Sequence, residues 1–279
     1  MTGETGARGN GGLTRDPAAM GREVLFDGTH LRAELIRPDA EVLFVRFDNL
    51  RLERNGFPQW SPSQRVAARG MAELSIMSAQ NDWFLNPDLG RLRAALRQVT
   101  GRYRTVRCLA FSMGGYGALL LSRALRLRHA VLVSPQFCVF ADQPPGDHRY
   151  RRFAGLMNWK LGDLTAVMVR KLHGVVLFDP VGHPMDRAQA RLILAQAPNM
   201  RGVAMTLGGH PATLAMMGTG AAQILQDHAY AGRADPALYR ALHVAARAVS
   251  PLYQQRLGEA LVKRASRPRA GCAPSGSPD

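Results

Sequence analysis

A serine, a histidine and two aspartates in this chain are placed where they could perform acyl chemistry together. Ser112 lies in the segment 106–121, where an apolar run typical of a strand meets a run typical of a helix. Small residues flank it, with Ala110 two positions before and Gly114 two positions after. A serine at so tight a turn takes a strained conformation that exposes its hydroxyl. The free N–H groups at the start of the helix favour negative charge beside that hydroxyl.

This segment resembles the nucleophile elbow of the α/β-hydrolase superfamily, usually written G-x-S-x-G, with Ala110 in place of the first glycine. A serine hydroxyl needs a base, and the resemblance implies a histidine just after the last strand. His210, in Leu207-Gly-Gly-His-Pro and 98 residues after Ser112, fits that place. His183 also follows the serine, but it precedes the last predicted strand. We therefore expect His210 to be the base.

The resemblance implies an acid after the strand that precedes the last one, and two aspartates fit. Asp179 directly follows the predicted strand 175–178, and we favour it by a narrow margin. Asp186 could instead cap the next helix, with Gln189 three residues later completing a capping box. Either carboxylate would orient His210 and stabilise its imidazolium.

Two backbone N–H groups are expected to form an oxyanion hole. One belongs to Met113, and the other comes from the loop after the predicted strand 41–47, by position from Asp48 or Asn49. The segments 81–84 and 134–136 end strands at the same edge of the sheet. We interpret both as loop packing rather than as substrate contacts.

Apolar runs and helix-forming segments alternate along the chain. The runs that predict strands are 24–26, 31–36, 41–47, 73–77, 106–111, 130–133, 175–178 and 203–207. The segments that predict helices are 65–71, 86–99, 112–127, 187–197 and much of 211–265. This alternation predicts an α/β fold, with a mostly parallel sheet and helices on both faces.

Composition and the resemblance together predict the domain organisation. Residues 1–20 and 266–279 have the composition of a disordered arm and a disordered tail. The resemblance implies that residues 21–265 form one α/β-hydrolase-like domain. Residues 135–173 exceed the length of a simple crossover, so they form either a small cap over the site or two surface helices.

Composition excludes several other classes of protein. The 279 residues are 46% apolar, enough for one large core without disulfides, and the three cysteines have no zinc-site spacing. No run of 18 apolar residues and no apolar secretory segment at the N-terminus occurs, so we expect no transmembrane segment and a cytoplasmic location. The net charge of +15 comes mostly from arginine, as in the GC-rich genome of a bacterium. We interpret it as a solvated surface without specific nucleic-acid binding.

No phosphate-binding loop, dinucleotide fingerprint or HExxH motif occurs, so no cofactor and no metal is expected. The leading hypothesis is a serine-dependent acyl hydrolase, esterase-like, that acts on a small-molecule acyl substrate through an acyl-enzyme. An acyltransferase with the same triad and a catalytically silent binding scaffold are the alternatives. The sequence does not choose an oligomeric state.

Overall fold

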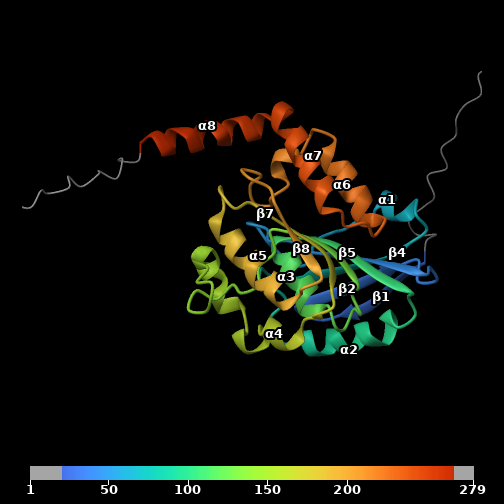
Figure 1. Ribbon diagram of the computed structural model, residues 1–279. Helices are drawn as coiled ribbons and strands as arrows, with labels where there is room; N and C mark the ends of the chain where they lie inside the picture. The colour runs from blue at the N-terminus through green and yellow to red at the C-terminus, as the bar shows by residue number, and fades with distance from the viewer. Residues whose placement is uncertain (1–20, 267–279) are drawn as a thin grey trace, which may run out of the picture.

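Eight strands form one sheet in the computed structural model, which describes residues 21–266 (Figure 1). The predicted arm at 1–20 and all of the predicted tail except Ser266 lie outside the described residues. The strands are β1 (Arg22–Asp27), β2 (Leu31–Ile36), β3 (Val42–Phe47), β4 (Ala72–Ser78), β5 (Thr105–Phe111), β6 (His129–Val133), β7 (His173–Phe178) and β8 (Met200–Ala204). Their order in the sheet is β1-β2-β4-β3-β5-β6-β7-β8. The pairs β1–β2 and β2–β4 are antiparallel, and all the others are parallel.

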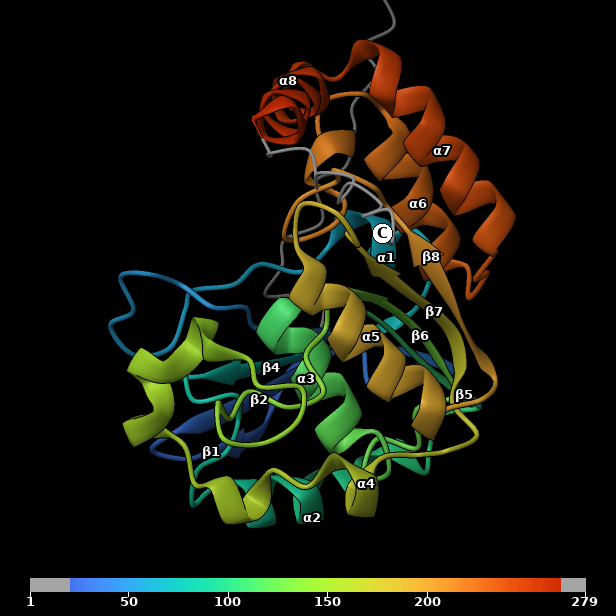
Figure 2. The same ribbon diagram turned by 60° about the vertical axis from the view of Figure 1, so that its left-hand side comes forward.

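Helices cover both faces of this sheet (Figure 2). They are α1 (Gln64–Ala67), α2 (Leu89–Thr100), α3 (Ser112–Leu121), α4 (Leu164–Val167), α5 (Pro184–Gln196), α6 (Ala221–Tyr230), α7 (Pro236–Val249) and α8 (Pro251–Ala265), with 3₁₀ turns η2 (His148–Leu156), η3 (Trp159–Leu161) and η4 (Leu214–Met216). One face is covered by α2 to α5 and the other by α1, α6 and α7, while α8 extends away from the sheet (Figures 1 and 2). The predicted α/β architecture is confirmed.

The central strands are apolar on both sides because each side faces a separate core. In β6, Ala130 and Leu132 pack into the core beneath α2 to α5, whereas Val131 and Val133 pack into the core beneath α6 and α7. A strand buried on both faces reads as a continuous apolar run, which explains the pattern in the sequence.

Several predicted boundaries are wrong, and for two of them the cause is a tertiary contact. The helix expected over 112–127 ends at Leu121, since the Ser122 hydroxyl turns back to the Leu119 carbonyl and accepts the N–H of Val169. The last strand ends at Ala204 and not at Leu207. Leu207 has a left-handed φ of 59°, and its N–H leaves the sheet for the Asp179 carboxylate. The chain therefore turns toward the site earlier than the apolar run suggests.

Candidate active site

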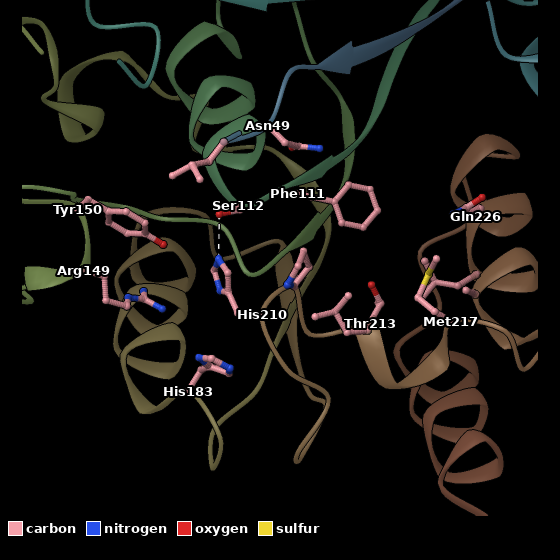
Figure 3. Close-up of a pocket in the computed structure, with 15 residues that line it drawn as sticks. Asn49, Phe111, Ser112, Arg149, Tyr150, His183, His210, Thr213, Met217 and Gln226 are labelled. Atoms are coloured by element: carbon pink, nitrogen blue, oxygen red, sulfur yellow. Dashed lines mark hydrogen bonds between the residues drawn. The ribbon is translucent and has the colours of Figure 1, made fainter. Parts of the chain in front are cut away.

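Ser112 lies at the junction between β5 and α3, at the carboxyl edge of the parallel strands. Its φ is 45°, a left-handed conformation that is strained for a residue with a side chain. The Ser112 Oγ atom lies 2.8 Å from Nε2 of His210 (Figure 3). The strained turn that the sequence predicts is therefore present, and it directs the hydroxyl at an imidazole.

Glycines allow α3 to pack closely against its neighbours at this point. A Cβ atom on Gly114 would lie 2.9 Å from the carbonyl oxygen of Asp48, and one on Gly117 would lie 2.5 Å from the Phe84 ring. Ala110, in place of the usual glycine, is 1% exposed and packs in the core. The small residues around Ser112 thus make room for the β3 loop and the Phe84 ring.

Asp186 is the aspartate that meets the histidine. Its Oδ2 atom accepts a hydrogen bond of 2.8 Å from Nδ1 of His210, and the residue is 1% exposed in the first turn of α5. Burial raises the pKa of this carboxyl, but the hydrogen bond and charge of His210, together with Arg149, outweigh burial and lower the pKa. The expected capping box is absent, because Gln189 bonds the backbone of 137–138 instead.

Asp179, which the sequence favours, has a different place in the structure. Its fully buried carboxylate accepts hydrogen bonds from the N–H groups of Val181, Gly182, Leu207 and Gly209, at 2.9–3.0 Å. No hydrogen bond joins it to His210 within the described residues. The preference for Asp179 as the partner of His210 is therefore wrong. Asp179 ties together its own loop and the loop that holds the histidine.

The loop after β3 differs from the expected oxyanion donors. The N–H of Asp48 donates to the carbonyl of Ile76 at 3.0 Å, and its carboxylate pairs with Arg54 at 2.5 Å. The N–H of Asn49 donates to the Asp48 carboxylate at 2.9 Å. The N–H of Leu50 has no partner among the described residues, and Leu50 lines the same cavity as Ser112. Asp48 and Asn49 therefore offer no free backbone donor, whereas Leu50 does.

Met113 is the second residue of α3, so its N–H is among those at the helix start that have no partner within the helix. This position is the one predicted for the first oxyanion donor. Together with the N–H of Leu50, it gives two free backbone donors in the two segments that meet at Ser112.

Gln136 contacts the nucleophile, although the sequence predicts only loop packing for the segment 134–136. Its buried Nε2 atom lies 3.2 Å from Ser112 Oγ and 3.1 Å from the Tyr150 hydroxyl, and its Oε1 atom accepts a hydrogen bond from the Trp83 indole at 3.1 Å. Burial raises the pKa of Tyr150 to about 12, so the phenol is neutral near pH 7. The nucleophile thus has a second polar neighbour besides His210.

Arg149 is a second contact that the sequence did not reveal, because the sequence predicts only a solvated surface for its many arginines. Its Nη1 atom donates to Oδ1 of Asp186 at 2.7 Å. With Tyr150 it belongs to η2, inside the insertion predicted at 135–173. Within that insertion, η2 reaches the site, whereas α4 packs against α3.

A cavity of about 700 Å³ opens above Ser112 and His210. In Figure 3 Arg149, Tyr150 and His183 lie on one side of the Ser112–His210 pair, and Phe111, Thr213, Met217 and Gln226 lie on the other. The second side is mostly apolar and is completed by Leu214, Ala222 and Leu225. The cavity therefore has a polar arm beside η2 and an apolar arm beside η4 and α6.

None of the helices within residues 21–266 is both long and apolar enough to cross a bilayer. No group of three or more histidine, cysteine, aspartate or glutamate side chains there is arranged to hold a metal ion.

Comparison with known proteins finds similarity in structure only. No protein-family model matches the chain, and no curated protein matches it significantly. Among solved structures, the chain is similar to the capsule O-acetyltransferase of Neisseria meningitidis serogroup A, with 14% identity, a TM-score of 0.47 and coverage of 72% of this chain and 93% of that one. It is also similar to an esterase of Pyrococcus furiosus, with 13% identity, a TM-score of 0.45 and coverage of 80% and 96%. A third is acetyl xylan esterase 1 from Thermoanaerobacterium sp., with 17% identity, a TM-score of 0.40 and coverage of 62% and 70%. At these identities the chemistry has to be inferred from the site itself.

Proposed function

We propose that this protein is a serine-dependent acyl hydrolase, with Ser112 as nucleophile, His210 as general base and Asp186 as the triad acid. The main support is the continuous chain of two hydrogen bonds, both 2.8 Å long, from the serine hydroxyl through the imidazole to a buried carboxylate. This arrangement gives a weak nucleophile a base and gives the base a fixed tautomer.

The proposed reaction forms and breaks an acyl-enzyme. Ser112 Oγ attacks the ester carbonyl carbon while His210 Nε2 takes the hydroxyl proton. The oxygen of the tetrahedral intermediate accepts hydrogen bonds from the N–H groups of Met113 and Leu50. The intermediate collapses as the alcohol leaves with the proton from His210, and the acyl group stays on Ser112. Water then attacks the acyl carbon with His210 as base, and the acid is released.

The shape of the cavity indicates the substrate class. Its apolar arm, lined by side chains such as Phe111, Leu214 and Leu225, suits an apolar acyl chain rather than an acetyl group alone. Each buried methylene contributes about 0.8 kcal/mol, or roughly fourfold in kcat/KM if the transition state keeps the contact. The imidazole of His210 is 18% exposed, so water can reach the acyl-enzyme and hydrolysis is the expected outcome.

Hydrolysis of p-nitrophenyl acetate, butyrate and octanoate tests this proposal. We expect kcat/KM to rise with chain length and Ser112→Ala to lower it by about 10⁴-fold or more while the circular dichroism spectrum stays unchanged. Ser61→Ala, at an exposed serine, is the matched control and should retain the wild-type rate. Undiminished hydrolysis by the Ser112 variant would exclude the mechanism. Release of p-nitrophenol only with an added alcohol, which then becomes acylated, would indicate an acyltransferase instead.

A further inference from the structure

Arg149 lies between two buried carboxylates, and one of them is the proposed triad acid. Its Nη1 atom donates to Oδ1 of Asp186 at 2.7 Å, while Nε and Nη2 donate to the two oxygens of Asp147 at 2.9 and 2.7 Å. Asp147 is 0% exposed and Asp186 is 1% exposed. Together the three groups have a net charge of −1, the charge that a single triad carboxylate would have.

Arg149 places a positive charge beside the triad acid, and the carboxylate of Asp147 compensates for that charge. A guanidinium paired with Asp186 alone would neutralise the charge that stabilises the His210 imidazolium in the transition state. Asp147 offsets that guanidinium from its other side, so the pair Arg149–Asp147 is neutral and Asp186 keeps its effect on His210. In addition, Arg149 occupies the oxygen of Asp186 that does not face the imidazole, which fixes the orientation of the carboxylate.

The rest of the network holds Asp147 in place. Gln189 of α5 donates to Oδ2 of Asp147 at 3.0 Å and also bonds the backbone of 137–138. Burial raises the pKa of the Asp147 carboxyl, but the hydrogen bonds and charge of Arg149 outweigh burial and lower it. Asp147 is therefore ionised in the folded protein near pH 7, as the charge balance requires.

We propose that Arg149 and Asp147 are positioning residues that set the net charge beside the triad acid, and through it how strongly the site stabilises the His210 imidazolium. This inference rests on the proposed hydrolase function, and it assigns the η2 segment a part in catalysis. The guanidinium orients Asp186, and the second carboxylate restores the negative charge that the guanidinium removes.

Other polar groups also face His210 and Asp186, and they stay constant in the test below. They are Ser112 of α3, Tyr150 of η2, His183 and Asp179 of the loop after β7, and Arg256 of α8, which donates to the carbonyl of Gly208. Burial lowers the pKa of His183, the one histidine among these groups. Because none is altered, differences between variants report the charges at 147 and 149.

The test is the pH dependence of kcat/KM for p-nitrophenyl butyrate, whose acid limb reports the base of the free enzyme. Asp147→Asn leaves the guanidinium uncompensated, so the midpoint of the limb should move to lower pH by about half a unit or more. Arg149→Met removes the positive charge, so the midpoint should move to higher pH by a similar amount. The double variant Asp147→Asn/Arg149→Met restores the net charge and should return the midpoint to within about 0.3 units of the wild type.

Two substitutions at exposed positions nearby serve as matched controls. Arg152→Met removes one positive charge from η2, and Asp142→Asn removes one negative charge from the segment before it. Neither side chain contacts the triad acid, and screening by water should leave the midpoint unchanged in both. Shifts in the controls as large as those at 147 and 149 would show a general charge effect and overturn the inference.

Opposite shifts in the single variants are the result that a purely structural role cannot produce. Unchanged midpoints in both, or shifts in the same direction, would overturn the inference. Arg149→Met leaves Asp147 buried without its partner, so if this variant does not fold, Asp147→Asn and the double variant still decide the question through the downward shift and its reversal. If the wild type itself showed no turnover that depends on Ser112, the proposed function would be refuted. That result is distinct from a failure of the inference about Arg149 and Asp147.

Discussion

Two aspartates seven residues apart, Asp186 and Asp179, hold His210 in place in different ways. Asp186 bonds the imidazole itself, whereas Asp179 bonds four backbone N–H groups in the loops on either side of it. A carboxylate that accepts several backbone N–H bonds is a strong local anchor. The first should therefore matter for the chemical step, and the second for the stability of the loops.

Substitution of each aspartate by asparagine separates these roles. We expect Asp186→Asn to lower kcat by about 10³- to 10⁴-fold, because the amide favours the wrong imidazole tautomer. Asp179→Asn should instead cost about 2–4 kcal/mol of unfolding free energy, because one amide oxygen cannot satisfy four N–H groups. Ester hydrolysis and urea unfolding of both variants measure the two effects. An equal loss of kcat with equal stability in both variants would contradict the division.

The sequence could predict Ser112 and His210 but could not choose between the aspartates. The serine and the histidine have local signals, namely small neighbours at a strand-to-helix junction and a glycine pair after the last strand. Both aspartates follow β7 closely, and only the turn at 180–183 decides which one reaches the imidazole. Contacts such as Gln136 and Arg149 depend on where the 135–173 segment returns to the sheet, which no local pattern encodes.

Close packing between α3 and the strands holds the nucleophile in place. We expect Gly117→Ala to cost about 1–3 kcal/mol of unfolding free energy, because its Cβ atom would lie 2.5 Å from the Phe84 ring. Gly90→Ala, in the first turn of α2 with no atom within 4 Å of its Cβ position, is the matched control and should be neutral or slightly stabilising. Urea unfolding gives both values. Equal stability of the two variants would contradict the packing argument.

The order and type of the elements follow from their hydrophobic patterns, and their ends do not. Every predicted strand exists, and the central ones are the easiest to predict because a strand between two cores needs a continuous apolar run. The ends of α3 and β8 are set by single long-range hydrogen bonds, from Val169 to Ser122 and from Leu207 to Asp179. Such bonds join residues far apart in sequence, so periodicity cannot reveal them.

One buried and one partly buried histidine make the stability of the whole molecule depend on pH. Burial lowers the pKa of His243 below 6.5, and burial together with Arg107, His173 and Arg128 does the same for His129. Below about pH 6.5 the unfolded chain therefore binds more protons than the native protein, so stability decreases as the pH falls. We expect the urea midpoint to be lower at pH 5.5 than at pH 7.5.

The replacement His243→Gln keeps a donor for the Thr206 carbonyl, which His243 contacts at 3.1 Å, but removes the titrating group. Its urea midpoint should change less between the two pH values than that of the wild type. The carboxylates whose pKa is lowered, such as Asp147 and Asp186, contribute their stability above about pH 3.8 and lose it below, so they leave this window unaffected. A wild-type midpoint that is the same at both pH values would contradict this account.

Reaction with a fluorophosphonate tests the central claim, that the fold makes one hydroxyl nucleophilic, without assuming a substrate. Such a reagent phosphonylates an activated serine and releases fluoride. Intact-mass and peptide mass spectrometry should show one adduct per chain, located on Ser112, formed far more slowly in His210→Ala and absent in Ser112→Ala. No adduct on the folded wild-type protein, or an adduct at Ser112 that forms equally fast without His210, would contradict the account.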